Sequence, residues 1–257
     1  MYIDFADYST IPSELEENII DAFTSMPQNV VSEIKARSVE GDLDVCCAIE
    51  KYLKQPKAQW LYERLNDIMS QYEIICYHAT KVLNKSSILN EGLKVNEIES
   101  YKNYIYDVCS ELEFEQENIN EIMKSINGTY ENKYKLSNPQ LCFFTNLSMI
   151  DTETPGYEQF CENIGGEWIR DALKTGHREL YKPLQEHGEA VIVKFKMPFQ
   201  NIIECKKDDA LYQIIVHYAG KYFWNKEFYI AFDGVTGQNV PPQNIIKLLP
   251  YSRKIDY

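Results

Sequence analysis

Ile74-Ile75-Cys76-Tyr77-His78-Ala79-Thr80 is the most informative part of the sequence, together with the segment Asn84–Leu93 (Asn-Lys-Ser-Ser-Ile-Leu-Asn-Glu-Gly-Leu) that follows it. The apolar run predicts a buried strand that ends at one polar histidine, after which the chain turns into a short helix. Asn84 is a good N-cap and Gly92 a good C-terminal stop, so both ends of that helix are marked. A histidine at the end of a buried strand is held where small molecules bind; the alternative interpretation is an ordinary histidine satisfied in a turn.

The length and composition are those of a folded protein. The chain has 257 residues, of which 44% are hydrophobic and 13% aromatic, enough for one large domain or for one domain with an accessory piece. No apolar run approaches the length of a membrane span, and the first residues lack the basic and apolar regions of a signal peptide. We therefore expect a cytoplasmic protein without a membrane partner; a secretion signal without a hydrophobic segment would leave no trace here.

The cysteine spacing and the net charge argue against metal binding and against non-specific binding of nucleic acids. The seven cysteines show neither a CxxC pair nor metal-ligand spacing, so we interpret them as reduced core residues and expect no metal. The net charge is −13, and an acidic surface repels phosphate, so we expect no non-specific nucleic-acid binding. Neither observation indicates an oligomeric state.

Residues 1–70 are predicted to form an N-terminal helical segment. Ser13 and Glu16 fit a capping box at the start of its first helix. Three amphipathic stripes at helical spacing follow, and none carries residues that suggest chemistry. The stripes are Leu15, Ile19 and Phe23; Val45, Ile49, Tyr52 and Leu53; and Trp60, Leu61, Leu65, Ile68 and Met69.

Residues 71–257 are predicted to form an α+β domain, because short β-rich segments bounded by turn residues begin at Tyr72. A helical insertion is expected at about residues 97–135. Another helix is expected from Gly156 to Gly176, broken in its middle by Gly165-Gly166. The predicted strands are Tyr72–Tyr77, Gln140–Thr145, Ala190–Met197 and Phe228–Phe232, and Asn244–Leu249 follows the turn at Pro241-Pro242.

Three segments of this domain resemble the signature blocks of the ADP-ribosyltransferase superfamily, in the branch of diphtheria toxin and the poly(ADP-ribose) polymerases. The first block is a strand ending in aromatic-His-Gly-Ser/Thr and a helix of the form I-L-x-x-G-L, which Tyr77–Thr80 and Ile88–Leu93 match at all but one position. The second block is similar to Leu141–Thr145. The third, a glutamate that opens a strand before a proline-marked turn and an Ile-Ile strand, is similar to Glu227–Ile230 with Val240–Ile246.

The resemblance implies a split antiparallel β-sheet core, NAD as the substrate and no metal. It implies that Glu227 is the catalytic carboxylate, which stabilises the oxocarbenium-like transition state formed when the nicotinamide–ribose bond breaks. His78, the other residue of the implied catalytic pair, hydrogen-bonds the adenosine-side ribose, and the backbone of Ala79 clasps the nicotinamide amide. The alternative for Glu227 is an ordinary solvated residue at a strand edge.

The resemblance also implies an NAD-binding set. An aromatic residue of the second block stacks on the nicotinamide ring, which assigns Phe143 or its neighbour Phe144, although alternation along a strand requires one of the two to face the core. Thr80 and Asn225 complete the set. Three residues depart from the family pattern: Ala79 replaces glycine, Phe143 replaces tyrosine, and Asn225 stands where arginine- or asparagine-directed relatives have Glu or Gln. The last departure leaves the acceptor chemistry open.

One further carboxylate has two interpretations. Glu167 and Arg170 follow the flexible pair Gly165-Gly166 on adjacent turns of a predicted helix. Glu167 is either a second active-site carboxylate or half of a local i, i+3 ion pair, and the spacing favours the ion pair.

The function that the resemblance implies is mono-ADP-ribosyl transfer from NAD to a macromolecular acceptor, either a protein or a specifically docked nucleic acid. A helical accessory segment is typical of toxin and effector enzymes of this size, so a toxin, effector or defence role is implied by analogy alone. The alternatives are an NAD glycohydrolase, with water as the acceptor, and a catalytically inactive ADP-ribosyltransferase-like binding module.

Overall fold

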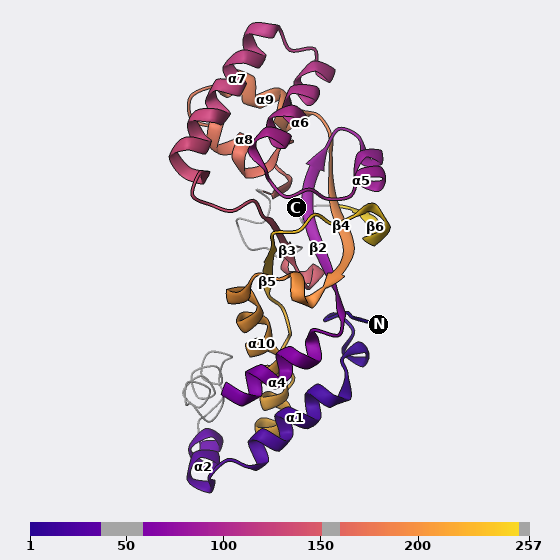
Figure 1. Cartoon of the computed structure of the whole chain (residues 1–257), viewed down its shortest axis with the longest axis vertical. Helices are drawn as coiled ribbons and strands as arrows, with labels where there is room; N and C mark the ends of the chain where they lie inside the picture. Colours follow the sequence, from indigo (N-terminus) through magenta and orange to yellow (C-terminus); the bar gives the residue numbers. More distant parts are fainter. Residues whose placement is uncertain (37–58, 151–159, 252–257) are drawn as a thin grey trace, which may run out of the picture. The chain divides into compact units, whose positions relative to one another are not determined.

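The computed structural model describes residues 1–36, 59–150 and 160–251, and this part of the chain is an α+β protein (Figure 1). Its described strands form an open antiparallel sheet in the order β5-β3-β2-β4-β6, and β1 pairs in parallel with β2 off that path. The strands are β1 (Tyr2–Ile3), β2 (Glu73–Val82), β3 (Leu141–Phe144), β4 (Glu189–Pro198), β5 (Asp233–Thr236) and β6 (Ile245–Pro250).

The chain divides into two compact units, each built from separate parts of the sequence. The first unit contains the described residues of Met1–Ile75, Phe144–Asn146 and Met197–Gly234, and the second contains those of Cys76–Phe143, Leu147–Lys196 and Val235–Tyr257. Residues 197–234, which follow the predicted boundary at residue 70, therefore belong with the N-terminal residues. No sequence pattern predicted this grouping, because it depends on contacts between segments that are distant in the sequence.

Helices dominate the first unit, where α10 packs against α1, α2 and α4 (Figure 1). The stripe Leu15, Ile19 and Phe23 is buried, as its spacing predicted. In the later stripe the four residues from Leu61 to Met69 are buried and Trp60 is exposed, while the stripe at Val45–Leu53 lies outside the described residues. The helices are α1 (Ser13–Thr24), α2 (Gln28–Ala36), α4 (Gln59–Met69) and α10 (Glu204–Trp224), and a short 3-10 helix, η1, spans Tyr8–Thr10.

The predicted capping box at the start of α1 is wrong. Ser13 is the first helical residue, and the N-cap position is taken by Pro12, which makes no side-chain cap hydrogen bond. Pro12 has a φ of −59° and an extended ψ of 131°, so the fixed ring geometry sets where the helix begins.

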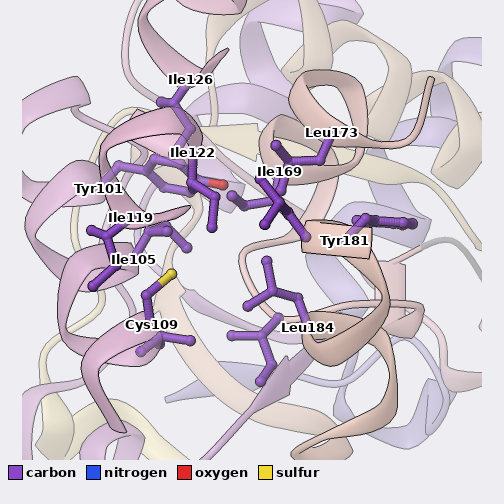
Figure 2. Close-up of a cluster of buried hydrophobic side chains, with 13 residues drawn as sticks. Tyr101, Ile105, Cys109, Ile119, Ile122, Ile126, Ile169, Leu173, Tyr181 and Leu184 are labelled. Carbon is purple, nitrogen blue, oxygen red and sulfur yellow. The ribbon is translucent and has the colours of Figure 1, made fainter. Parts of the chain in front are cut away.

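The second unit carries most of the sheet and a layer of helices. The predicted insertion forms α6 and α7, which continue into a π-helical turn, η3. Isoleucines of α7 at positions 119, 122 and 126 pack into one buried cluster with residues of α8 and α9 (Figure 2). The helices are α5 (Lys85–Glu91), α6 (Ile98–Glu111), α7 (Gln116–Thr129), η3 (Tyr130–Tyr134), α8 (Gly166–Leu173) and α9 (Arg178–Glu186).

The glycine pair begins a helix and does not interrupt one, so the prediction of a helix broken at Gly165-Gly166 is wrong. Within the described residues, α8 starts at Gly166, and Gly165 is its N-cap with φ +85°. A Cβ at Gly165 would lie 2.7 Å from side-chain atoms of Ile105 and Ile169, so both its conformation and its surroundings require glycine. Residues 151–159, including the predicted helix start at Gly156, lie outside the described part of the chain.

Strand β4 forms as predicted. Val191, Val193 and Phe195 are buried, and Lys194 and Lys196 are half-exposed, as expected for a strand with one solvated face. Ile192 lies on the same face as the lysines and is buried, so the alternation holds for the later half of the strand only. Its antiparallel register with β6 runs from Val191 opposite Pro250 and shifts between Lys194 and Phe195.

The prediction of a strand at Phe228–Phe232 is wrong, because the strand in this region, β5, begins only at Asp233. Phe228, Ile230 and Phe232 are buried at the period-2 spacing of a strand, which explains the prediction. Side chains bond the backbone here: the Thr145 hydroxyl donates to the carbonyl oxygen of Phe232 and accepts from its N–H, at 3.0 and 3.1 Å. The Thr145 N–H also donates to the Phe232 carbonyl oxygen at 3.2 Å, so a backbone hydrogen bond is made at the end of this segment although no strand forms there.

Candidate functional site

His78 lies within strand β2 and not at its end, which corrects the sequence-based expectation. The strand continues to Val82 because the alternation of burial continues: Tyr77 and Ala79 are buried, and His78 and Thr80 are half-exposed. Ala79, which replaces the family glycine, is thus an ordinary strand residue. Thr80 lies on the same face of the strand as His78, two residues on.

A backbone carbonyl of the neighbouring strand fixes the His78 ring. Nδ1 lies 2.8 Å from the carbonyl oxygen of Cys142 on β3. A carbonyl oxygen only accepts hydrogen bonds, so Nδ1 carries the proton and, in the neutral ring, Nε2 is left as an acceptor. Burial lowers the pKa of His78, and the hydrogen bond to Cys142 opposes this shift in part. His78 is therefore a neutral imidazole with an acceptor nitrogen near pH 7.

The helix that follows has the caps that the sequence predicted. The Asn84 side chain accepts from the Ser86 N–H at 2.8 Å, and Gly92 ends α5 with φ +79°. Leu93 then pairs with Val240 through two backbone hydrogen bonds of 2.9 Å, which join the end of the first block to the proline-marked turn of the third. A Cβ at Gly92 would lie 1.9 Å from the Val240 carbonyl oxygen, so glycine is required at this crossing.

Both aromatic candidates of the second block are buried, whereas alternation required only one of them to be. Phe143 has no exposed surface, and its ring meets the Phe195 ring edge-on, with centroids 6.2 Å apart. Phe144 is also buried, and it lies in the first unit, whereas Phe143 lies in the second. In this structure Phe143 is a core residue, and neither face of its ring is accessible for stacking on nicotinamide.

Glu227 is exposed on a segment of the first unit that has no strand pairing in the described residues. It follows the end of α10, where Asn225 is the C-cap in the left-handed conformation, with φ +52°. Asparagine adopts this conformation more readily than most residues, which gives Asn225 a structural reason at this position. The expectation that Glu227 opens a strand is wrong, since five residues separate it from β5.

The predicted site residues fall into both units. His78, Ala79, Thr80 and Phe143 belong to the second unit, and Phe144, Asn225 and Glu227 belong to the first. A single cleft holding His78 and Glu227 stays a prediction.

Glu167 and Arg170 form the i, i+3 ion pair that the spacing favoured, with 3.3 Å between Oε1 and the guanidinium. Lys133 of η3 lies 3.6 Å from the same carboxylate and also pairs with Asp171. Burial tends to raise the pKa of Asp171, but hydrogen bonds from Lys133 and Tyr134 outweigh it and lower that pKa. Glu167 is thus part of a surface ion network.

Aromatic rings pack beside this network, around the side chain of Trp168. The Tyr134 ring is stacked on Trp168 with centroids 4.9 Å apart, and the Tyr101 ring meets it edge-on at the same distance. The tyrosines come from α6 and η3, and no local sequence pattern connects them with Trp168.

Sequence reasoning missed two residues beside Glu227. His217 on α10 and Tyr8 on η1 both contact the backbone that follows Glu227, within the first unit. His217 is buried. Tyr8 is 219 positions from Glu227, so no local pattern connects them. The one sequence signal for a buried histidine was the position of His217 in a largely apolar helical segment, which became α10.

The described residues contain no group of three or more His, Cys, Asp or Glu side chains arranged to hold a metal ion. Cys76, Cys109 and Cys161 are buried free thiols, as expected of core residues, whereas Cys142 and Cys205 are exposed, which the core interpretation did not anticipate. In the same part of the chain, no helix has the length and apolar character needed to cross a membrane.

Comparison with protein-family models, curated proteins and solved structures found no match to this chain. The functional conclusion therefore rests on the residues described above.

Proposed function

We propose that this chain is a mono-ADP-ribosyltransferase with the split antiparallel sheet core of that superfamily, which transfers ADP-ribose from NAD to a macromolecular acceptor. The observation that carries the proposal is the fixed, neutral imidazole of His78, tied through Nδ1 to the Cys142 carbonyl. An acceptor nitrogen at Nε2 suits a ribose hydroxyl, which donates a hydrogen bond. The Nδ1–carbonyl bond by itself is not peculiar to a binding site, since His187 makes the same kind of contact with Pro183 at the end of α9; the position of His78 in the segment that resembles the first block is what gives the bond its meaning.

The arrangement of the second unit supports the proposal further. The strand with His78 leads into the capped helix α5, and Leu93 pairs with Val240 just before Pro241-Pro242. Two segments that match the first and third blocks are thereby hydrogen-bonded to each other. Their contact was not used to recognise the blocks, so it is independent support.

The proposed reaction needs one carboxylate. The bond between ribose C1′ and the nicotinamide nitrogen breaks, and its electron pair leaves with nicotinamide. A nucleophilic atom of the acceptor bonds to C1′ and releases its proton to water. Glu227 stabilises the positive charge that develops on the ribose, and its exposed position allows a macromolecule to approach. Asn225 has a structural role as the C-cap of α10, so we assign it no role in selecting the acceptor.

The burial of Phe143 favours a second candidate, a catalytically inactive ADP-ribosyltransferase-like binding module. A ring with no exposed surface offers no face for nicotinamide to stack on. An NAD glycohydrolase uses the same residues as the transferase with water as the nucleophile, so it differs in its product alone.

NAD labelled in its adenylate part, incubated with the protein in buffer and in a cell lysate, distinguishes these functions. A transferase releases nicotinamide and leaves the label on lysate macromolecules, and separate protease and nuclease digestion identifies a protein or nucleic-acid acceptor. A glycohydrolase releases free ADP-ribose at the same rate in buffer and lysate. Saturable NAD binding without nicotinamide release supports the inactive module, and absence of NAD binding contradicts all three functions.

The biological setting belongs to the same proposal. We infer a toxin, effector or defence enzyme that acts in a cytoplasm, on a protein or on a specifically docked nucleic acid. The net charge of −13 supports the expectation that plain DNA and RNA are neither bound nor modified indiscriminately. Label appearing on every nucleic acid in the lysate would contradict it.

A further inference from the structure

Tyr8 and His217 form a pair within the first unit, and both contact the backbone just after Glu227. Their ring centroids lie 4.5 Å apart. His217 Nδ1 donates to the carbonyl oxygen of Phe228 at 2.5 Å, and the Tyr8 hydroxyl lies 3.5 Å from the same oxygen. The Tyr8 hydroxyl also accepts from the N–H of Ile230 at 3.3 Å.

These contacts replace a strand ladder. Phe228 and Ile230 are buried, and a buried backbone N–H or carbonyl without a partner costs free energy comparable to a lost hydrogen bond. The described residues pair no strand with this segment, so Tyr8 and His217 satisfy its polar groups from the side. The two rings come from η1 and α10, near the opposite ends of the chain.

His217 is the more firmly held member of the pair, because Tyr8 is half-exposed on the short helix η1. His217 is 1% exposed and lies on a long helix, so its ring has little freedom. Burial lowers the pKa of His217, and the carboxylates of Glu227 and Glu16 and the ammonium of Lys221 act on it with smaller effects. Burial raises the pKa of Tyr8, and the hydrogen bond from the Ile230 N–H opposes this shift.

We propose that Tyr8 and His217 are positioning residues that hold the Glu227 carboxylate in its productive orientation. This inference rests on the proposed function, and it gives residues 1–10 a role in catalysis through the placement of the 227–230 backbone. The contacts of the pair are with the backbone of Phe228 and Ile230, so its proposed effect on the reaction is exerted through that backbone. Removing either contact loosens the segment and moves the carboxylate away from the place where charge develops.

The test uses the full-length protein and two measurements on each variant. Hydrogen exchange of the peptide that covers residues 226–232 reports how often the segment opens. Steady-state nicotinamide release gives kcat and KM for NAD. Tyr8→Phe removes only the hydroxyl, His217→Leu removes the donor, and His217→Asn keeps an amide N–H near the place of Nδ1.

We expect Tyr8→Phe and His217→Leu each to speed exchange of the 226–232 peptide by about tenfold, because each leaves a buried backbone group without a hydrogen-bond partner. We expect kcat to fall by a similar factor and KM for NAD to change less than about twofold, because the ground-state contacts with NAD are intact. His217→Asn should recover most of both values. A purely structural role for His217 would not produce rescue of kcat at constant KM.

The matched control is Tyr181→Phe. The Tyr181 hydroxyl donates to Asn163 at 2.9 Å inside the second unit, so this variant loses a buried tyrosine hydrogen bond that is remote in sequence from the Glu227 segment. It should leave exchange of residues 226–232 unchanged. If Tyr181→Phe accelerates that exchange as much as Tyr8→Phe does, the effect is global destabilisation and the inference is overturned.

Three other results decide the matter. Unchanged exchange in both Tyr8→Phe and His217→Leu overturns the inference, whatever the activity. Faster exchange with unchanged kcat also overturns it, because the segment would then be held without positioning the carboxylate. A wild-type protein that releases no nicotinamide contradicts the proposed function, and with it the catalytic part of this inference, while the exchange data separately decide whether the pair holds the segment.

Discussion

At the scale of single residues, the environment of each ionisable group decides what it can do. His78 and Glu227 illustrate the two extremes, since one imidazole is bonded to a backbone carbonyl in a sheet and the carboxylate is exposed beyond a helix end. The chemistry proposed for them needs a neutral acceptor and a charged stabiliser, respectively. The proposed role of Glu227 is tested by kinetics, and the lowered pKa of His78 by the pH dependence of stability.

Glu227→Gln is expected to keep the fold and NAD binding and to lower nicotinamide release by about a hundredfold or more, because it removes charge stabilisation that matters mainly in the transition state. Steady-state kinetics and NAD titration measure the two effects separately. Glu167→Gln is the comparison, because its carboxylate is already paired with Arg170 and Lys133. Full activity in Glu227→Gln together with loss in Glu167→Gln would move the catalytic role to Glu167.

The lowered pKa values of His78 and His217 predict acid sensitivity. The folded-state pKa values of His78 and His217 lie below the ordinary 6.5, so the unfolded chain binds more protons than the folded one as the pH falls through that value. The stability that they contribute is therefore present at pH 7 and above and is lost toward pH 5. Urea unfolding at both values measures it. His217→Asn should show a smaller loss, and an equal loss would mean that His217 does not contribute.

At the scale of elements, the sequence predicted most accurately where a local rule and the tertiary surroundings agree. Each cap of α5 is determined by a single residue, Asn84 at its start and Gly92 at its end. The alternation of burial along the later half of β4 follows from the two-residue period of a strand. The errors arose where a neighbour overrode the local rule. Pro12 set the start of α1, and Thr145 with Tyr8 and His217 took the place of a partner strand beside Phe228–Phe232.

Gly92→Ala tests the junction between α5 and the turn near Val240. We expect a loss of more than about 1 kcal/mol, because alanine at φ +79° is strained and its Cβ would overlap the Val240 carbonyl oxygen. Gly128→Ala in α7 is the control, since a Cβ there meets nothing within 4 Å and a helical alanine should add about 0.4–1 kcal/mol. Thermal or urea unfolding measures both, and a neutral Gly92→Ala would contradict the close crossing.

At the scale of the whole molecule, the candidate site was harder to predict than the fold class. Periodicity identified the α+β class and the helices of residues 97–135, because each signal lies within a few turns of chain. The two compact units join residues far apart in sequence, and so do the Tyr8–His217 pair and the carbonyl that holds His78. Such contacts follow from packing, which a single sequence does not display.

The grouping of α10 with the N-terminal helices predicts the behaviour of a fragment. Residues 71–257 alone should fail to form a monomeric folded protein, because Phe223 and the rest of the buried face of α10 would lose α1 and α4. Gel filtration and dye binding measure this against the full chain. A monomeric fragment with a cooperative unfolding transition would instead support the domain boundary that the sequence predicted.

The stack of Tyr134 on Trp168 also makes the protein its own optical reporter. The chain has three tryptophans, and Trp168 lies in the second unit while Trp60 and Trp224 lie in the first. Replacing Trp60 and Trp224 with phenylalanine leaves one fluorophore whose emission depends on the ring stacked upon it. Its spectrum follows the second unit alone, and the complementary Trp168→Phe protein follows the first. Ligand-induced and denaturant-induced changes can thus be assigned to one unit without attaching a label.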